Sequence, residues 1–151
     1  MRLLALDIGE KRIGVAISES GILATPYSVL ERKSKKEDFN RLQRIITEQK
    51  IAKVIVGLPY SLSDPQRIGP QARRVQRYTE ALSQKLPIPI EYFDESYSTV
   101  DAQAYLLSSG RKKTPLDAAA AAVILQNYLD TRQNELKTQF SAEMSERDGE
   151  R

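Results

Sequence analysis

The chain has 151 residues, of which 40% are hydrophobic and 28% charged, a length and composition typical of one globular domain with its own core. It contains no cysteine and no histidine, which excludes disulfides, thiolate metal sites and imidazole catalysis, so acid–base or metal chemistry must use carboxylates, Lys, Tyr or water. No apolar run is long enough to cross a membrane and no signal-peptide pattern is present, so we expect a cytoplasmic protein without a membrane partner.

The charge of the chain is unevenly distributed. The formal net charge is +3, but residues 141–151 carry a net charge of −2, which leaves +5 on residues 1–140. A moderately basic body can attract a polyanion such as nucleic acid, although many proteins this basic bind none. Beyond about Phe140 the composition becomes polar and loses periodicity, so we expect one domain over residues 1–138 and a disordered tail over 139–151.

The first predicted element is a buried strand over residues 2–9, in which the apolar run ends at Asp7. An ionised carboxylate at this position needs a partner, and ligands collect outside the carboxyl ends of such strands. Asp7 is therefore a candidate site residue, or else it accepts hydrogen bonds from the turn at Gly9. Lys11 and Arg12 follow in the same turn and could contact the phosphates of a nucleic acid.

The later elements alternate between strands and helices. Strands are expected over 13–18, 23–30, 53–57 and 89–93, and helices are expected to begin at Ser34, Pro70, Ser98 and Thr114-Pro115. The first three strands form an antiparallel meander, and right-handed crossovers place helices on both faces of the sheet. The sequence thus predicts an α/β fold with a five-stranded mixed sheet and a central first strand.

Two further groups of basic residues are candidates for nucleic-acid binding. Arg73, Arg74 and Arg77 lie on the second predicted helix, and Arg111, Lys112 and Lys113 form a loop before the last helix. Both groups could hold the phosphate backbone of a substrate strand. The alternative for the helix group is a solvated surface.

Three acidic residues could meet at one edge of the predicted sheet. Parallel strands would bring Asp7 and Glu95 together, and Asp117 would join them if the last helix packs across that edge, which the small residues 118–122 permit. Carboxylates without histidine suit one or two Mg²⁺ or Mn²⁺ ions, and a pair of such ions can promote phosphodiester hydrolysis.

Two alternatives to this acidic site stay open. Asp94 competes with Glu95, because the pleat of a strand turns only one of them toward the site. Asp117 also stands where an acid would complete a capping box with Thr114.

Four motifs in order resemble the YqgF (RuvX) family over about residues 2–130. They are Asp7 to Ala16, Ile55 to Pro59, Asp94-Glu95 with Ser98 to Ala102, and Asp117 to Ala120. The resemblance implies a ribonuclease H-like fold and a metal-dependent nuclease that processes the 5′ end of precursor 16S ribosomal RNA, in association with ribosomal subunits. It also implies that Asp7, Glu95 and Asp117 form the acidic triad.

Other functions compatible with parts of the sequence define the alternatives. The same family has been linked to cleavage of four-way DNA junctions, and a non-catalytic RNA-binding assembly factor would also suit the fold and charge. An actin-like kinase or ATPase would need a second domain and a second phosphate loop, which this short chain lacks. Ser96 and Tyr97 stand where the family usually has Arg and Leu. This difference affects how the substrate backbone would be bound and leaves the acidic triad unchanged.

Overall fold

The computed structural model describes residues 1–59, 69–94 and 115–149. The strands are β1 (Leu3–Ile8), β2 (Arg12–Ser18), β3 (Thr25–Glu31), β4 (Lys53–Leu58) and β5 (Ile90–Asp94). The helices are α1 (Lys35–Glu48), α2 (Pro70–Ser83) and α4 (Leu116–Gly149). The helix that we expected to begin at Ser98, and the basic loop before the last helix, lie outside the described residues.

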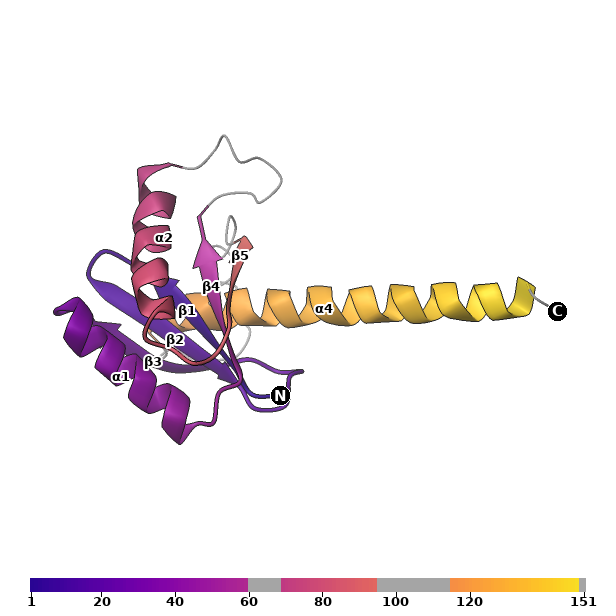
Figure 1. Ribbon diagram of the computed structural model, residues 1–151, viewed down its shortest axis with the longest axis horizontal. Helices are drawn as coiled ribbons and strands as arrows, with labels where there is room; N and C mark the ends of the chain where they lie inside the picture. The colour runs from indigo at the N-terminus through magenta and orange to yellow at the C-terminus, as the bar shows by residue number, and fades with distance from the viewer. Residues whose placement is uncertain (60–68, 95–114, 150–151) are drawn as a thin grey trace.

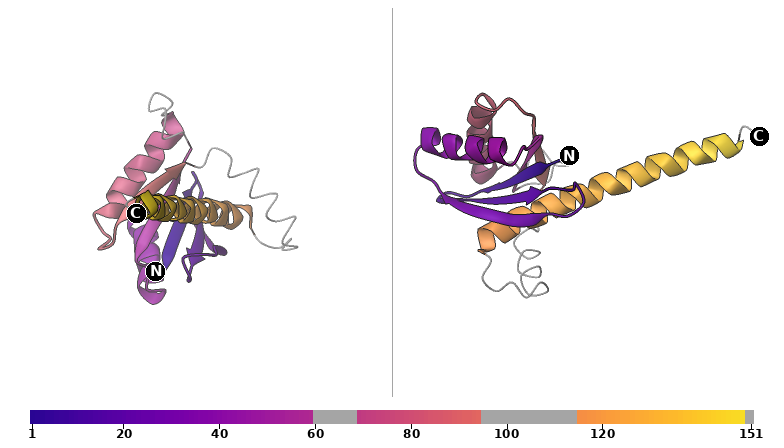
Figure 2. Two further views of the ribbon diagram at one scale, coloured as in Figure 1. Left: turned by 90° about the vertical axis from the view of Figure 1, so that its right-hand side faces the viewer. Right: turned by 90° about the horizontal axis from the view of Figure 1, so that it is seen from below.

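The five strands form one mixed sheet in the order β3-β2-β1-β4-β5. β1 is antiparallel to β2 and parallel to β4, and β4 is parallel to β5. Helices α1 and α2 cover one face of the sheet, and α4 crosses the other (Figures 1 and 2). The predicted meander, the central position of β1 and the placement of helices on both faces are confirmed.

The pleat of β1 divides the core between the two faces of the sheet. Leu4, Leu6 and Ile8 belong to the apolar cluster that includes the buried residues of α1 and α2. Leu3 and Ala5 point the other way and belong to a cluster with the buried residues of α4. Because successive side chains of a strand alternate between faces, Asp7 falls on the α4 face.

The first turn of α4 lies directly on β2. A Cβ atom built on Gly14 would lie 1.9 Å from the carbonyl oxygen of Asp117, so only glycine leaves room for this contact. The helix then continues with five buried alanines, residues 118–122, whose small side chains keep it close to the sheet. This packing confirms that small residues bring the last helix across the sheet.

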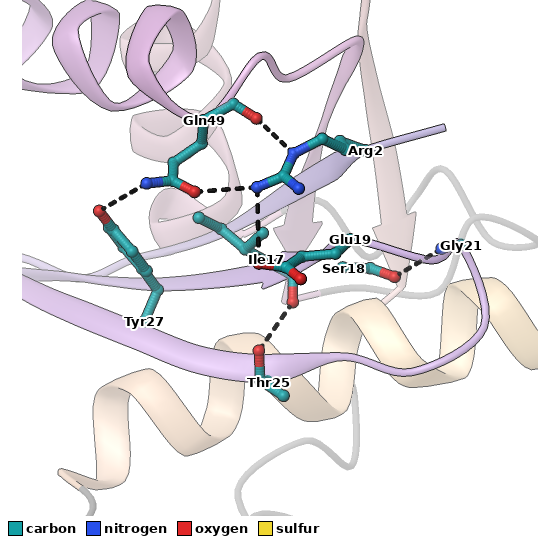
Figure 3. A network of polar contacts seen from close by, with 8 residues as sticks. All are labelled: Arg2, Ile17, Ser18, Glu19, Gly21, Thr25, Tyr27 and Gln49. Atoms are coloured by element: carbon teal, nitrogen blue, oxygen red, sulfur yellow. Dashed lines mark hydrogen bonds and ion pairs between the residues drawn. The ribbon is translucent and has the colours of Figure 1, made fainter.

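A polar network closes the opposite edge of the sheet, where β1 begins and α1 ends (Figure 3). The guanidinium of Arg2 donates to the backbone oxygen of Gln49 and, over 2.9 Å, to its side-chain oxygen. The same guanidinium lies 3.6 Å from Glu19, just beyond the end of β2. These contacts link β1, β2 and α1 at the edge far from Asp7.

Helix α4 continues past the expected boundary at residue 138 and runs to Gly149 (Figure 1). We predicted a disordered tail over 139–151, whereas residues 139–149 are helical. The segment contains no proline, and its only glycine is the last helical residue. Extending an existing helix costs far less than starting one, so a helix already fixed on the sheet can continue through a polar segment. The predicted domain boundary at residue 138 stays a prediction.

We predict that Gly14→Ala lowers the free energy of unfolding by about 1–3 kcal/mol, the usual cost of forcing an extra carbon into a packed contact. The added methyl group would press on the backbone of Asp117, which cannot move without shifting α4. Urea unfolding measures the change. The matched control is Gly69→Ser, which adds a side chain where nothing lies within 4 Å of a Cβ atom and should change the stability little. Equal stability of Gly14→Ala and wild type would contradict the close contact.

Candidate active site

Asp7 and Asp117 both adjoin Gly14, from opposite directions. Asp7 is the register partner of Gly14 across the β1–β2 pair, and Asp117 packs its backbone over the same glycine. Cross-strand partners share a face of the sheet, so Asp7, Gly14 and the first turn of α4 meet on one face. Two of the three predicted acidic residues are therefore brought to one place, by elements more than a hundred residues apart in the chain.

Arg12 forms an ion pair with one of these acids. Its Nε lies 3.2 Å from Oδ2 of Asp117, and the two side chains are 61% and 40% exposed. A pair this open to solvent stabilises the fold by less than about 1 kcal/mol. Arg12, predicted as a phosphate contact, thus lies beside Asp117 and is held only weakly.

The third predicted acid, Glu95, lies outside the described residues. Its competitor Asp94 ends β5, in register with Leu58. Along β5, Tyr92 packs against the α1–α2 cluster and Phe93 against the α4 cluster. The alternation puts Asp94 on the side of Tyr92, away from Asp7.

The turn between β1 and β2 is held in place by Arg32, the residue that follows β3, and through it by Tyr78 of α2. The Gly9 amide donates to the Arg12 carbonyl over 2.8 Å, which closes the turn. This amide therefore has its acceptor within the turn. Arg32 donates to the Gly9 carbonyl over 2.9 Å and stacks 4.5 Å above the ring of Tyr78. Burial, together with the carboxylate of Asp38, raises the pKa of Tyr78 above its ordinary value, so the hydroxyl stays protonated and donates to Asp38.

The arginines of α2 extend this region on the opposite face of the sheet. Arg73, Arg74 and Arg77 are all exposed. Arg74 pairs with Glu10 of the β1–β2 turn at 2.5 Å, so the first half of α2 lies beside that turn. The basic loop Arg111, Lys112 and Lys113 lies outside the described residues, as does Thr114, so its proposed capping box with Asp117 is not tested.

A polar cluster that sequence reasoning missed fixes the middle of α4 to the sheet. The hydroxyl of Tyr128 donates to Glu91 over 2.8 Å and accepts from Lys53 and Arg132 over 3.0 and 2.9 Å. Lys53 also pairs with Glu91. These residues come from β4, β5 and α4, and sequence separations of 37 and 75 residues left no local signal that could have revealed the cluster.

Both charged residues of β4 and β5 in this cluster have shifted pKa values. The hydrogen bond from Lys53 holds the pKa of Glu91 below its ordinary value of 4.5. Burial would lower the pKa of Lys53, but its hydrogen bonds to Glu91 and Tyr128 outweigh burial and raise it above 10.5. The stabilisation by Glu91 is therefore present above pH 4.5 and is lost as the pH falls through its folded-state pKa, whereas that by Lys53 is lost only above pH 10.5.

We predict that Glu91→Gln lowers the free energy of unfolding at neutral pH by about 1 kcal/mol or less, since the pair is partly open to solvent. The difference from wild type should shrink as the pH falls below 4.5, where wild-type Glu91 becomes protonated. Urea unfolding between neutral and acid pH measures this. Glu80→Gln, an exposed change on α2, should show no such convergence. A pH-independent difference for Glu91→Gln would contradict the assigned role.

Among the helices described, none combines the length and apolarity needed to span a membrane. No group of three or more His, Cys, Asp or Glu side chains suited to a metal ion occurs within 1–59, 69–94 and 115–149, the ranges that leave out Glu95.

Comparisons with known proteins match nearly the whole chain. The family model described as "RuvX: Holliday junction resolvase" matches residues 1–131. A protein of Thermoanaerobacter pseudethanolicus is 42% identical over 140 residues, covering 89% of this chain and 99% of its own. A protein of Trichormus variabilis is 38% identical over 145 residues, covering 93% and 95%. Both carry the name "Putative pre-16S rRNA nuclease".

Solved structures with low sequence identity share the fold. RuvC of T. thermophilus, solved with a Holliday junction substrate, has a TM-score of 0.58 at 15% identity and covers 88% of this chain and 96% of its own. The fowlpox virus resolvase bound to Holliday junction DNA has a TM-score of 0.52 at 14% identity, with 87% and 98% covered. These likenesses confirm the predicted ribonuclease H-like fold.

Proposed function

Because this chain belongs to the RuvX family, we propose that it is a nuclease that hydrolyses phosphodiester bonds of precursor 16S ribosomal RNA. The observation that carries the proposal is the contact of Asp117 with Gly14, which sets this acid beside Asp7 on one face of the sheet. The names of the relatives supply the substrate class. We further propose that the protein acts in the cytoplasm, at or near the small ribosomal subunit.

The carboxylates of the site fit a divalent cation in their chemistry. Asp7 and Asp117 offer oxygen ligands, and Glu95 would complete the set. Oxygen-rich sites without histidine favour Mg²⁺ or Mn²⁺. When bound, one or two such ions would supply Lewis-acid stabilisation of the phosphate and activation of water.

The cationic residues around the acids are suited to holding the substrate strand. Arg12 pairs with Asp117 and Arg74 pairs with Glu10, each through a contact exposed to solvent. Replacing such a contact by one with a phosphate costs little free energy. Lys11 lies exposed in the same turn. In the bound state these side chains orient the backbone over the acidic residues, with Arg111, Lys112 and Lys113 as further proposed contacts.

A four-way DNA junction is the second candidate substrate. The matching family is described as Holliday junction resolvases, and two solved structures with this fold contain such junctions. Parallel cleavage assays on precursor 16S ribosomal RNA and on a synthetic four-way junction separate the two. Binding without cleavage of either would favour the assembly-factor alternative.

We predict that Asp7→Asn, Glu95→Gln and Asp117→Asn each reduce cleavage of precursor 16S ribosomal RNA by about 10³-fold or more. When catalytic residues act as a unit, substitution of any one of them removes most of the activity. Double variants should therefore be only slightly less active than single ones. Excess chelator should abolish cleavage by the wild type. Glu80→Gln, an exposed carboxylate on α2, is the control and should cleave normally. Full activity in chelator, or a wild-type rate for Asp117→Asn, would contradict the site.

A second prediction concerns the arginines of α2. Replacing Arg73 and Arg77 by Ala should weaken RNA binding and reduce the slope of log K against log salt by about 0.7 for each lost phosphate contact to a single strand. Sequence preference should change little, because phosphate contacts carry no sequence information directly. Filter binding across a salt series measures the slope. Removing the same charge from exposed positions on α1 and just after α2, with Arg44→Ala and Lys85→Ala, should leave it nearly unchanged.

A further inference from the structure

The second half of α4, which we call the α4 arm (residues 131–149), extends away from the sheet (Figures 1 and 2). Apart from the half-buried Gln133, its side chains from Thr131 to Glu146 are exposed. At 1.5 Å per residue the arm is about 28 Å long. The family model matches residues 1–131, so it ends where the arm begins.

An apolar stripe runs along the arm. Leu136, Phe140 and Met144 are 59%, 65% and 47% exposed and stand four residues apart, so they lie on one side of the helix. The stripe continues the side that α4 buries in the body, because Leu136 follows the buried Leu129 by two turns. The surface by which α4 packs thus extends past the end of the sheet, with large side chains open to solvent.

A helical arm of this kind is stable only marginally by itself. Most of the stability of helices in proteins comes from packing an amphipathic face, and a contiguous exposed apolar patch on a soluble protein marks an interaction surface. A second helix with an apolar stripe of its own would bury this one. The charges of the arm indicate that this second helix is the arm of another copy of the chain.

The charges differ between the two halves of the arm. Residues 132–138 carry a net charge of +1 and residues 139–149 a net charge of −2. Two parallel arms would set like charges side by side, whereas two antiparallel arms set the acidic end of each beside the basic half of the other. Phe140 lies near the middle of the arm, where a twofold axis would place the two copies of its ring together.

We propose that two copies of this chain associate through their α4 arms, packed antiparallel with the stripes of Leu136, Phe140 and Met144 facing each other. The interface is self-complementary, as a twofold dimer requires. It leaves the candidate active site, at the other end of α4, open to substrate.

Sedimentation equilibrium of the full chain tests the proposal. The wild type should approach a mass twice the 17.0 kDa of one chain as the concentration rises. Phe140→Glu should raise the dissociation constant about tenfold or more, through the lost apolar contact and the buried charge. Thr138→Glu adds the same charge to an exposed position on the opposite side of the arm and should leave the dimer intact. Circular dichroism checks that each variant remains folded.

A charge-reversal experiment tests the antiparallel arrangement. Glu143→Lys with Glu146→Lys should weaken self-association, since it places added positive charge beside Lys137 of the other copy. Lys137→Glu should weaken it as well, and mixing the two variants should restore a dimer. A wild type that stays monomeric at all concentrations would overturn the proposal, as would a dimer unaffected by Phe140→Glu. Cleavage assays are separate measurements, so either proposal can fail without the other.

Discussion

A Cβ atom on Gly14 would collide with the Asp117 carbonyl at 1.9 Å, so the first turn of α4 reaches β2 only because this residue has no side chain. The buried alanines that follow keep the helix near the sheet for another turn and a half. The site depends on this approach. Without it, the carboxylate of Asp117 would be lifted away from Asp7, which is fixed in the central strand as the register partner of Gly14.

The cations around the site are paired with acids in the absence of substrate. Arg12 contacts Asp117 and Arg74 contacts Glu10, both through side chains largely open to water. Such pairs gain little free energy, so a polyanion can replace them at small cost while releasing its own counterions. The same arrangement limits repulsion between the acids when no cation is bound there. In contrast, Arg32 bonds the Gly9 carbonyl and stacks on Tyr78, which suits a structural role in holding the turn.

Local patterns were sufficient to predict the described strands, the starts of the described helices and the close packing of the last helix on the sheet. The apolar runs, the Ser34 cap and the crossover rule together led to the observed sheet order, and small residues after Asp117 indicated the close helix. Contacts between distant polar residues had no such pattern. Tyr128 meets Glu91 and Lys53 through the tertiary fold alone. Polar composition after Phe140 gave no sign that α4 continues to Gly149, where no helix-breaking residue intervenes.

Helix α4 combines three surfaces in one uninterrupted rod, since no glycine or proline occurs between Leu116 and Asp148. Its first turn presents Asp117, its middle is fixed to β4 and β5 through Tyr128, and its end carries the apolar stripe. A rod held at its middle by hydrogen bonds to two strands resists sliding along its axis. The hydrogen bonds of Tyr128 to Glu91 and Lys53 lie between the arm and Asp117. The region of α4 that carries the apolar stripe is thus separated from the region that carries the acid by a point fixed to the sheet.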